Sequence, residues 1–126
     1  MKNKQQKILI IEDDAWLAQN YIRVFEKRNY IVKVTDNATQ AIDLIDSFQP
    51  DAIVLDLLIS DTTAFPLLHE IQSYTDISEI PIIICSNLAS ELTLNNLAPY
   101  GVKKIIDKTT MLPEDLVAAV KMVVRD

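Results

Sequence analysis

The sequence predicts an α/β fold, (βα)5, in which five parallel strands alternate with five helices. Short apolar runs at residues 8–11, 52–55 and 82–85 are rich in β-branched side chains and apolar at every position. Such runs are typical of strands that are covered on both faces. Segments whose apolar residues recur at helical spacing separate them. Strands that alternate with helices form parallel sheets, because each helix returns the chain across one face.

The strands are expected, in chain order, at residues 8–11, 31–35, 52–55, 82–85 and 102–106. The second and fifth of these runs contain polar residues, which edge strands tolerate better than central ones. This distribution is consistent with a doubly wound sheet in the order 2-1-3-4-5, with the topological switch point between strands 1 and 3. Sheets of this kind bind ligands beside the switch point, outside the carboxyl ends of the strands.

Three helices are indicated by apolar stripes at helical spacing. The stripes comprise Leu17, Tyr21, Val24 and Phe25, then Ala38, Ala41, Ile42, Ile45 and Phe48, and finally Leu116, Val120, Val123 and Val124. Asn37 suits the N-cap of the second helix, and Pro113 suits the first turn of the last. Two further helices, expected at residues 63–74 and 88–98, have a weaker pattern.

Composition limits the class of protein. A length of 126 residues, of which 49% are hydrophobic, predicts one domain over residues 1–126, with residues 1–6 as a flexible N-terminus. No stretch is long enough to span a membrane. A net charge of −6 argues against nucleic-acid binding, and the single glycine excludes a glycine-rich phosphate loop. One cysteine excludes an internal disulfide and favours a cytoplasmic location.

Charged and hydroxyl side chains follow four of the predicted strands. Glu12, Asp13 and Asp14 follow the first, Asp56 the third, Ser86 the fourth and Lys108 the fifth. Parallel strands bring these groups to one edge, where clustered carboxylates require a cation. Oxygen ligands without histidine or thiolate favour Mg²⁺. A carboxylate beside Mg²⁺ and a lysine can accept a phosphoryl group, with a hydroxyl bound to its oxygen.

A structural interpretation of the acidic residues stays open beside this one. Acidic side chains favour helix N-termini, so one or two of Glu12, Asp13 and Asp14 could serve only as caps. Capping does not account for their expected convergence with Asp56. Trp16, next to these acids, is expected to pack at a helix start, where its fluorescence could report bound Mg²⁺.

Four motifs together resemble the receiver domains of bacterial two-component response regulators, including chemotaxis regulators. The motifs are KILIIEDD, PDAIVLD, PIIICS and GVKKIIDK, and they end near Asp14, at Asp56, at Ser86 and at Lys108. The resemblance covers almost the whole chain and implies a flavodoxin-like fold. It implies that Glu12, Asp13, Asp56 and the backbone carbonyl of Leu58 bind the metal, that Asp56 is the phospho-acceptor, and that Ser86 and Lys108 contact the phosphoryl group.

The resemblance also implies partners. The phosphoryl group would come from a sensor histidine kinase or a histidine phosphotransfer protein, and the switched domain would act on a downstream protein or effector domain. It would be a signalling switch that loses its phosphoryl group slowly, and not an enzyme. Homodimerisation, and whether the chain acts alone or is a piece of a longer regulator, stay open.

The chain departs from the family at four positions. Ser60 and Ala64 replace a proline and a glycine, Thr109 replaces the proline after Lys108, and Ile105 occupies the switch position that is often aromatic. We expect a different path into the third helix, a trans bond before Thr109, and a changed relay at Ile105.

Three other functions are considered. A degenerate receiver would bind partners without phosphorylation, as the departures above allow. A small phosphatase would need a second acid two residues after Asp56, where the chain has Leu58. A flavodoxin-like cofactor binder would share the sheet order, but residues 12–14 would repel its phosphate.

Overall fold

The computed structural model of the chain describes residues 5–59, 62–87 and 92–124. Its central sheet has five parallel strands in the order β2-β1-β3-β6-β7. The strands are β1 (Lys7–Ile11), β2 (Ile31–Thr35), β3 (Ala52–Asp56), β6 (Ile82–Ser86) and β7 (Val102–Asp107). Since β6 and β7 are its fourth and fifth strands, this order is the predicted 2-1-3-4-5.

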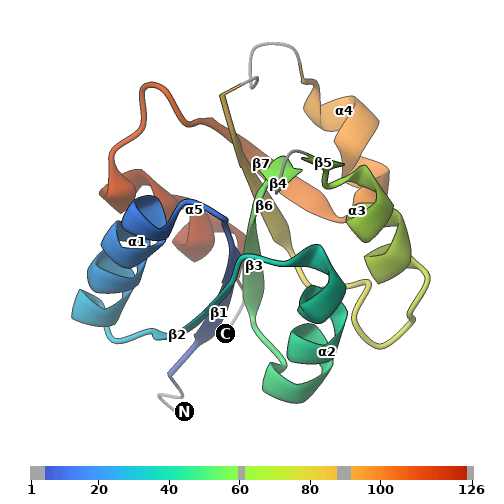
Figure 1. Ribbon diagram of the computed structural model, residues 1–126, viewed down its shortest axis with the longest axis horizontal. Coiled ribbons are helices and arrows are strands. Elements are labelled where there is room, and N and C mark those ends of the chain that lie inside the picture. The colour runs from blue at the N-terminus through green and yellow to red at the C-terminus, as the bar shows by residue number, and fades with distance from the viewer. Residues whose placement is uncertain (1–4, 60–61, 88–91, 125–126) are drawn as a thin grey trace.

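Helices cover both faces of the sheet (Figure 1). One face carries α1 (Ala15–Lys27) and α5 (Pro113–Val123). The other carries α2 (Ala38–Phe48), α3 (Phe65–Gln72) and the short α4 (Leu94–Leu97). Within the described part of the chain, no helix combines the length and the apolar character needed to cross a lipid bilayer.

The continuous apolar runs arise because alternate residues of each strand enter different core layers. In β1, Leu9 and Ile11 pack in the layer of α2 and α3, whereas Ile8 and Ile10 pack in the layer of α1 and α5. All four side chains are fully buried. The edge strand β2 differs, since Ile31 at its start is 39% exposed. The polar interruptions therefore predicted the edges correctly.

The helix at residues 88–98 was predicted too long. Within the described residues, α4 has only four residues, Leu94–Leu97, and a 3₁₀ helix, η2 (Ala98–Tyr100), follows it; residues 88–91 lie outside the described part. The helix begins only at Leu94, where Thr93 is the N-cap and its hydroxyl accepts a hydrogen bond from the Asn96 N–H. At the other end, Pro99 has no N–H group to continue the α-helical pattern. Gly101 then ends the segment at φ 85°, a left-handed conformation that favours glycine.

The path into α3 also differs from a simple loop. A short antiparallel pair, β4 (Leu58–Ile59) and β5 (Thr62–Thr63), separates β3 from α3, which begins at Phe65 rather than at residue 63. Ala64 precedes the helix at φ −88°, so its backbone does not need the freedom of a glycine. Ser60, the other departure in this segment, lies outside the described residues.

The expectation of a flexible N-terminus concerns residues 1–6, of which 1–4 lie outside the described residues. Gln5 donates a hydrogen bond from its side chain to the Asn29 side chain at 2.9 Å, and the Gln6 carbonyl accepts one from the Ile31 N–H at 2.9 Å. These contacts join the start of β1 to the start of β2.

Candidate functional site at the carboxyl edge of the sheet

Three charged side chains from separate strands meet at the carboxyl edge of the sheet. Glu12 follows β1, Asp56 ends β3 and Lys108 follows β7. Residues spaced two apart on a strand point to the same face, so Glu12 continues the row of Ile10, and Asp56 that of Val54, in the layer of α1 and α5. The parallel registry thus produces the convergence that the sequence predicted.

Lys108 connects the two buried carboxylates. Its Nζ lies 2.8 Å from Glu12 Oε1 and 3.0 Å from Asp56 Oδ2. The side chains are 10% exposed for Lys108, 2% for Glu12 and 11% for Asp56, so solvent screens these pairs weakly. A carboxylate oxygen of the exposed Asp13 completes the group, and ligand atoms of Glu12, Asp13 and Asp56 all lie within 4.8 Å of one another.

The electrostatic balance of the site favours an additional positive charge. Burial raises the pKa of Glu12 above its ordinary value, although the hydrogen bond from Lys108 offsets part of this effect. Burial alone would lower the pKa of Lys108, but its hydrogen bonds to Glu12 and Asp56 outweigh this and raise it. One ammonium group thus faces three carboxylates. A hard divalent cation bound by oxygen atoms would compensate the remaining charge.

Asp14 is the acid that serves as a helix cap. Its Oδ1 accepts hydrogen bonds from the N–H groups of Trp16 at 3.0 Å and Leu17 at 3.1 Å. Its own N–H donates to Glu12 Oε2 at 3.1 Å. The capping interpretation therefore holds for Asp14, while Glu12 is fixed at both of its carboxylate oxygens.

A pocket of about 590 Å³ adjoins the charged group. Besides Glu12, Asp56 and Lys108, its lining includes Trp16 and Tyr21 from α1. Trp16 is 72% exposed, so the expectation that it packs at the helix start is wrong. The spacing of Tyr21 predicts only a place on the apolar stripe and gives no sign that the residue also lines this pocket.

Ser86 and Leu58 are placed near the site by the backbone. Ser86 ends β6, is 2% exposed, and its carbonyl accepts a hydrogen bond from the Lys108 N–H at 3.0 Å. Since Asp56 pairs with Cys85 in the sheet, Ser86 lies one residue beyond it on the neighbouring strand. Leu58 starts β4, two residues after Asp56. The roles of Ser86 and of the Leu58 carbonyl stay predictions.

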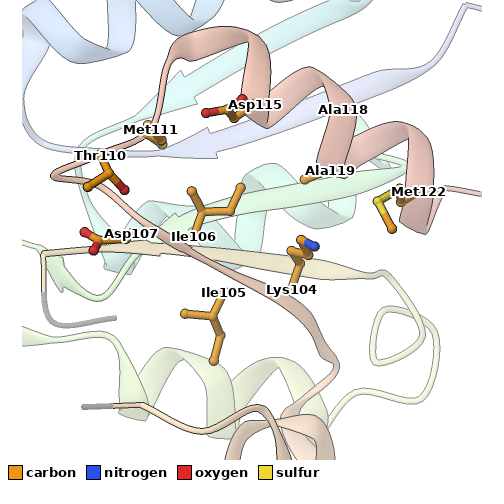
Figure 2. A pocket seen from close by; sticks show the side chains of 10 residues that line it. All are labelled: Lys104, Ile105, Ile106, Asp107, Thr110, Met111, Asp115, Ala118, Ala119 and Met122. Carbon is orange, nitrogen blue, oxygen red and sulfur yellow. The ribbon is translucent and has the colours of Figure 1, made fainter. Parts of the chain in front are cut away.

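The position predicted to be the switch, Ile105 on β7, holds an aliphatic side chain. Figure 2 shows Ile105 and Ile106 on opposite sides of the strand, with Ile106 on the side of α5. Ile105 is partly buried against the layer of α2 and α3. The peptide bonds of the described residues are all trans, as expected for Lys108–Thr109. Thr109 fixes this turn by donating from N–H and hydroxyl to Asp107 Oδ1, at 2.9 and 2.6 Å.

Cys85, next to the site on β6, is predicted to be inert. It is 1% exposed, and burial raises the pKa of its thiol to about 12. The thiolate is the reactive form, so at pH 8 we expect labelling by a thiol reagent to be about 1,000-fold slower in the folded protein than in denaturant. Absorbance of the released thiol chromophore measures both rates. Comparable rates would contradict the buried placement of Cys85.

Comparisons with known proteins agree with this fold and show the family of the chain. The chain belongs to the response regulator receiver domain family, whose model matches residues 8–121. The transcriptional regulatory protein KdpE of Staphylococcus aureus is 38% identical over 104 residues, covering 82% of this chain and 44% of that protein. BaeR of Escherichia coli is 29% identical over 119 residues, covering 94% and 48%. The chain thus spans about half the length of these relatives or less.

Solved receiver structures have the same fold. A two-component response regulator from Clostridium difficile superposes with a TM-score of 0.81 at 26% identity, covering 94% of each chain. The receiver domain of the sensor histidine kinase PA1611 from Pseudomonas aeruginosa gives a TM-score of 0.81 at 19% identity, covering 94% of this chain and 97% of that one. The latter structure has a magnesium ion coordinated in its active site cleft. The resemblance seen in the sequence motifs is therefore confirmed.

Proposed function

We propose that Asp56 is the phospho-acceptor of this receiver domain. The observation that carries the proposal is the position of Lys108, which bonds both Glu12 and Asp56 at the edge of the sheet. Glu12 is held at both oxygens and is deeply buried, which suits a fixed ligand more than a nucleophile. Asp56 lies at the end of a central strand and lines the pocket through which a phosphoryl donor would approach.

The cation that fits this donor set is Mg²⁺. Glu12, Asp13 and Asp56 would hold it, with the Leu58 carbonyl as a further ligand, and all of these are hard oxygen donors. Bound Mg²⁺ would neutralise charge on the carboxylate and on the phosphoryl oxygens. Support comes from the proximity of the three carboxylates and from the magnesium ion in the PA1611 receiver domain.

The proposed reaction is transfer from a phosphohistidine of a sensor kinase or phosphotransfer protein. An Asp56 oxygen attacks phosphorus and forms the O–P bond, while the P–N bond breaks and its electron pair stays on the imidazole, which takes up a proton. The Lys108 ammonium group offsets charge on the phosphoryl oxygens. The Ser86 hydroxyl donates a hydrogen bond to one of them. The product is an aspartyl phosphate that is lost slowly by hydrolysis.

The output is a change of shape that a partner reads. Ser86 would turn toward the phosphoryl group, and because it ends β6, this motion would act on the segment leading to α4. Ile105 lacks an aromatic ring, so we infer that the relay depends more on Ser86 than on this position. The downstream partner is a protein or an effector domain, and a homodimer is one form that the signal could take. The single, buried Cys85 fits a cytoplasmic location.

A receiver that acts without phosphorylation is less well supported. The departures that suggested it in the described residues are Ala64, Ile105 and Thr109. None of them lines the pocket beside the charged group. These departures affect the loop before α3, the proposed relay and the turn after β7. The proposed acceptor Asp56, the acidic pair Glu12 and Asp13, and Lys108 all lie together at the edge of the sheet.

The proposal is tested by treating the purified protein with acetyl phosphate and Mg²⁺. Intact mass spectrometry is expected to show the added mass of one phosphoryl group, which EDTA prevents and hydroxylamine removes, as an acyl phosphate requires. Peptide mapping after borohydride reduction is expected to place the group at Asp56. A folded protein that gains no mass under these conditions, or gains it elsewhere, would refute the assignment.

A further inference from the structure

The Tyr21 hydroxyl is a polar group that the core does not explain. Tyr21 is 1% exposed and packs in the layer of α1 and α5, together with Val24 and Phe25. Its hydroxyl oxygen is buried and makes no hydrogen bond to any group of the described residues. Buried hydroxyl groups normally have partners, because an unpaired one costs stability that a phenylalanine would not.

The direction of α1 brings Tyr21 to the pocket beside the charged site. The helix begins at Ala15, directly after the acidic residues 12–14, so its N-terminus lies at the carboxyl edge of the sheet. Side chains on a helix tilt toward its N-terminus. Tyr21, almost two turns along, thus extends its ring back toward that edge and lines the same pocket as Glu12, Asp56 and Lys108.

The surroundings of the hydroxyl are rich in negative charge. Burial, and after it the carboxylates of Glu12 and Asp56, raises the pKa of Tyr21 above its ordinary value. The phenol therefore keeps its proton at physiological pH and stays neutral. A neutral hydroxyl can accept one hydrogen bond and donate another, which suits it to a water molecule placed between it and a charged centre.

We propose that Tyr21 is a positioning residue of the cation site, whose hydroxyl binds a water molecule of the hydration shell of Mg²⁺. The inference rests on the cation site proposed above. Mg²⁺ keeps several of its waters in proteins, because protein groups seldom fill its octahedral shell. Those waters are strong donors and need acceptors, and partners of this kind tune metal affinity. Each Glu12 oxygen already accepts one hydrogen bond and Glu12 is also a proposed ligand of the cation, so the phenol oxygen supplies a further acceptor for a water on the α1 side.

The proposal predicts opposite behaviour with and without the cation. Tyr21→Phe removes an unpaired hydroxyl and keeps the ring, so the Tm of the Mg²⁺-free protein is expected to stay unchanged or to rise. The same substitution removes a hydrogen bond from the bound state, so Mg²⁺ affinity is expected to fall about three- to tenfold. If the role of Tyr21 were purely structural, the substitution would lower both the Tm and the Mg²⁺ affinity, or it would leave the affinity unchanged.

Titration with Mg²⁺ alone measures the affinity, by calorimetry and by the fluorescence of Trp16, the single tryptophan, which lines the same pocket. Tyr74→Phe is the matched control: Tyr74 is 43% exposed and does not line the pocket, so its substitution should change neither quantity. Equal affinity of wild type and Tyr21→Phe would overturn the role of Tyr21 while leaving the cation site in place. A Tyr21→Phe protein that melts at a lower temperature without Mg²⁺ would also overturn it. Absence of Mg²⁺ binding by the wild type would overturn both proposals.

Discussion

Asp56→Asn is expected to abolish phosphoryl incorporation and, at the same time, to stabilise the Mg²⁺-free protein. The amide has nearly the shape of the carboxylate but is not a nucleophile toward phosphorus. The substitution also removes the charge of one of three carboxylates whose oxygen atoms lie within 4.8 Å of one another. Lys108 keeps its 2.8 Å bond to Glu12, and the amide oxygen can still accept from it. The free energy gained by reducing the repulsion is therefore expected to exceed, by about 1 kcal/mol, the free energy lost because the interaction with Lys108 becomes weaker.

For a chain of this size that free energy corresponds to a rise in Tm of about 3 °C. Thermal melts in EDTA and in Mg²⁺ measure it, and mass spectrometry with acetyl phosphate measures the loss of modification. Mg²⁺ should stabilise the wild type through binding to the folded state, and the variant much less. Asp43→Asn, at an exposed position of α2, is the matched control and should change neither property. An Asp56→Asn protein that melts lower in EDTA would contradict the account of charge repulsion.

The sheet could be predicted from the sequence because both of its faces are covered. Runs such as residues 8–11 and 82–85 are apolar at every position, and each observed strand extends them by one residue at most. Convergence of Glu12, Asp56 and Lys108 followed from topology alone, since parallel strands end at one edge. The strands and the convergence of the site residues depend on the local pattern of apolar residues and on strand direction, and both can be inferred from the sequence.

Other features depend on tertiary contacts that no local pattern encodes. The spacing of Glu12, Asp13 and Asp14 cannot tell which acid caps the helix; backbone geometry assigns that role to Asp14. An apolar stripe assigns Tyr21 to the core, and only the packing of α1 against the sheet makes it line the pocket as well. The start of α4 is likewise set by the Thr93 cap, and its end by Pro99 and the turn that follows.

Lys108→Met is expected to destabilise the Mg²⁺-free protein strongly. The methionine keeps most of the apolar stem, but Glu12 and Asp56 lose their shared cation while remaining buried. Removing one partner of a buried pair costs about 3 kcal/mol, because the other charge is left uncompensated. In EDTA the Tm should fall by about 10 °C. Lys103→Met, at an exposed position of β7, is the matched control and should have little effect.

The same substitution is expected to tighten Mg²⁺ binding, because Lys108 occupies the oxygens of Glu12 and Asp56 that the cation needs. Calorimetry should therefore show a lower Kd for Lys108→Met, and saturating Mg²⁺ should restore part of the lost Tm. Lys108→Met and Asp56→Asn both alter the same 3.0 Å ion pair. If the contact itself stabilised the fold, both would lower the Mg²⁺-free Tm. If the excess of negative charge governs stability, Lys108→Met must lower the Mg²⁺-free Tm and Asp56→Asn must raise it. An equal fall in Tm for both variants would reject the charge balance on which the proposed cation site depends.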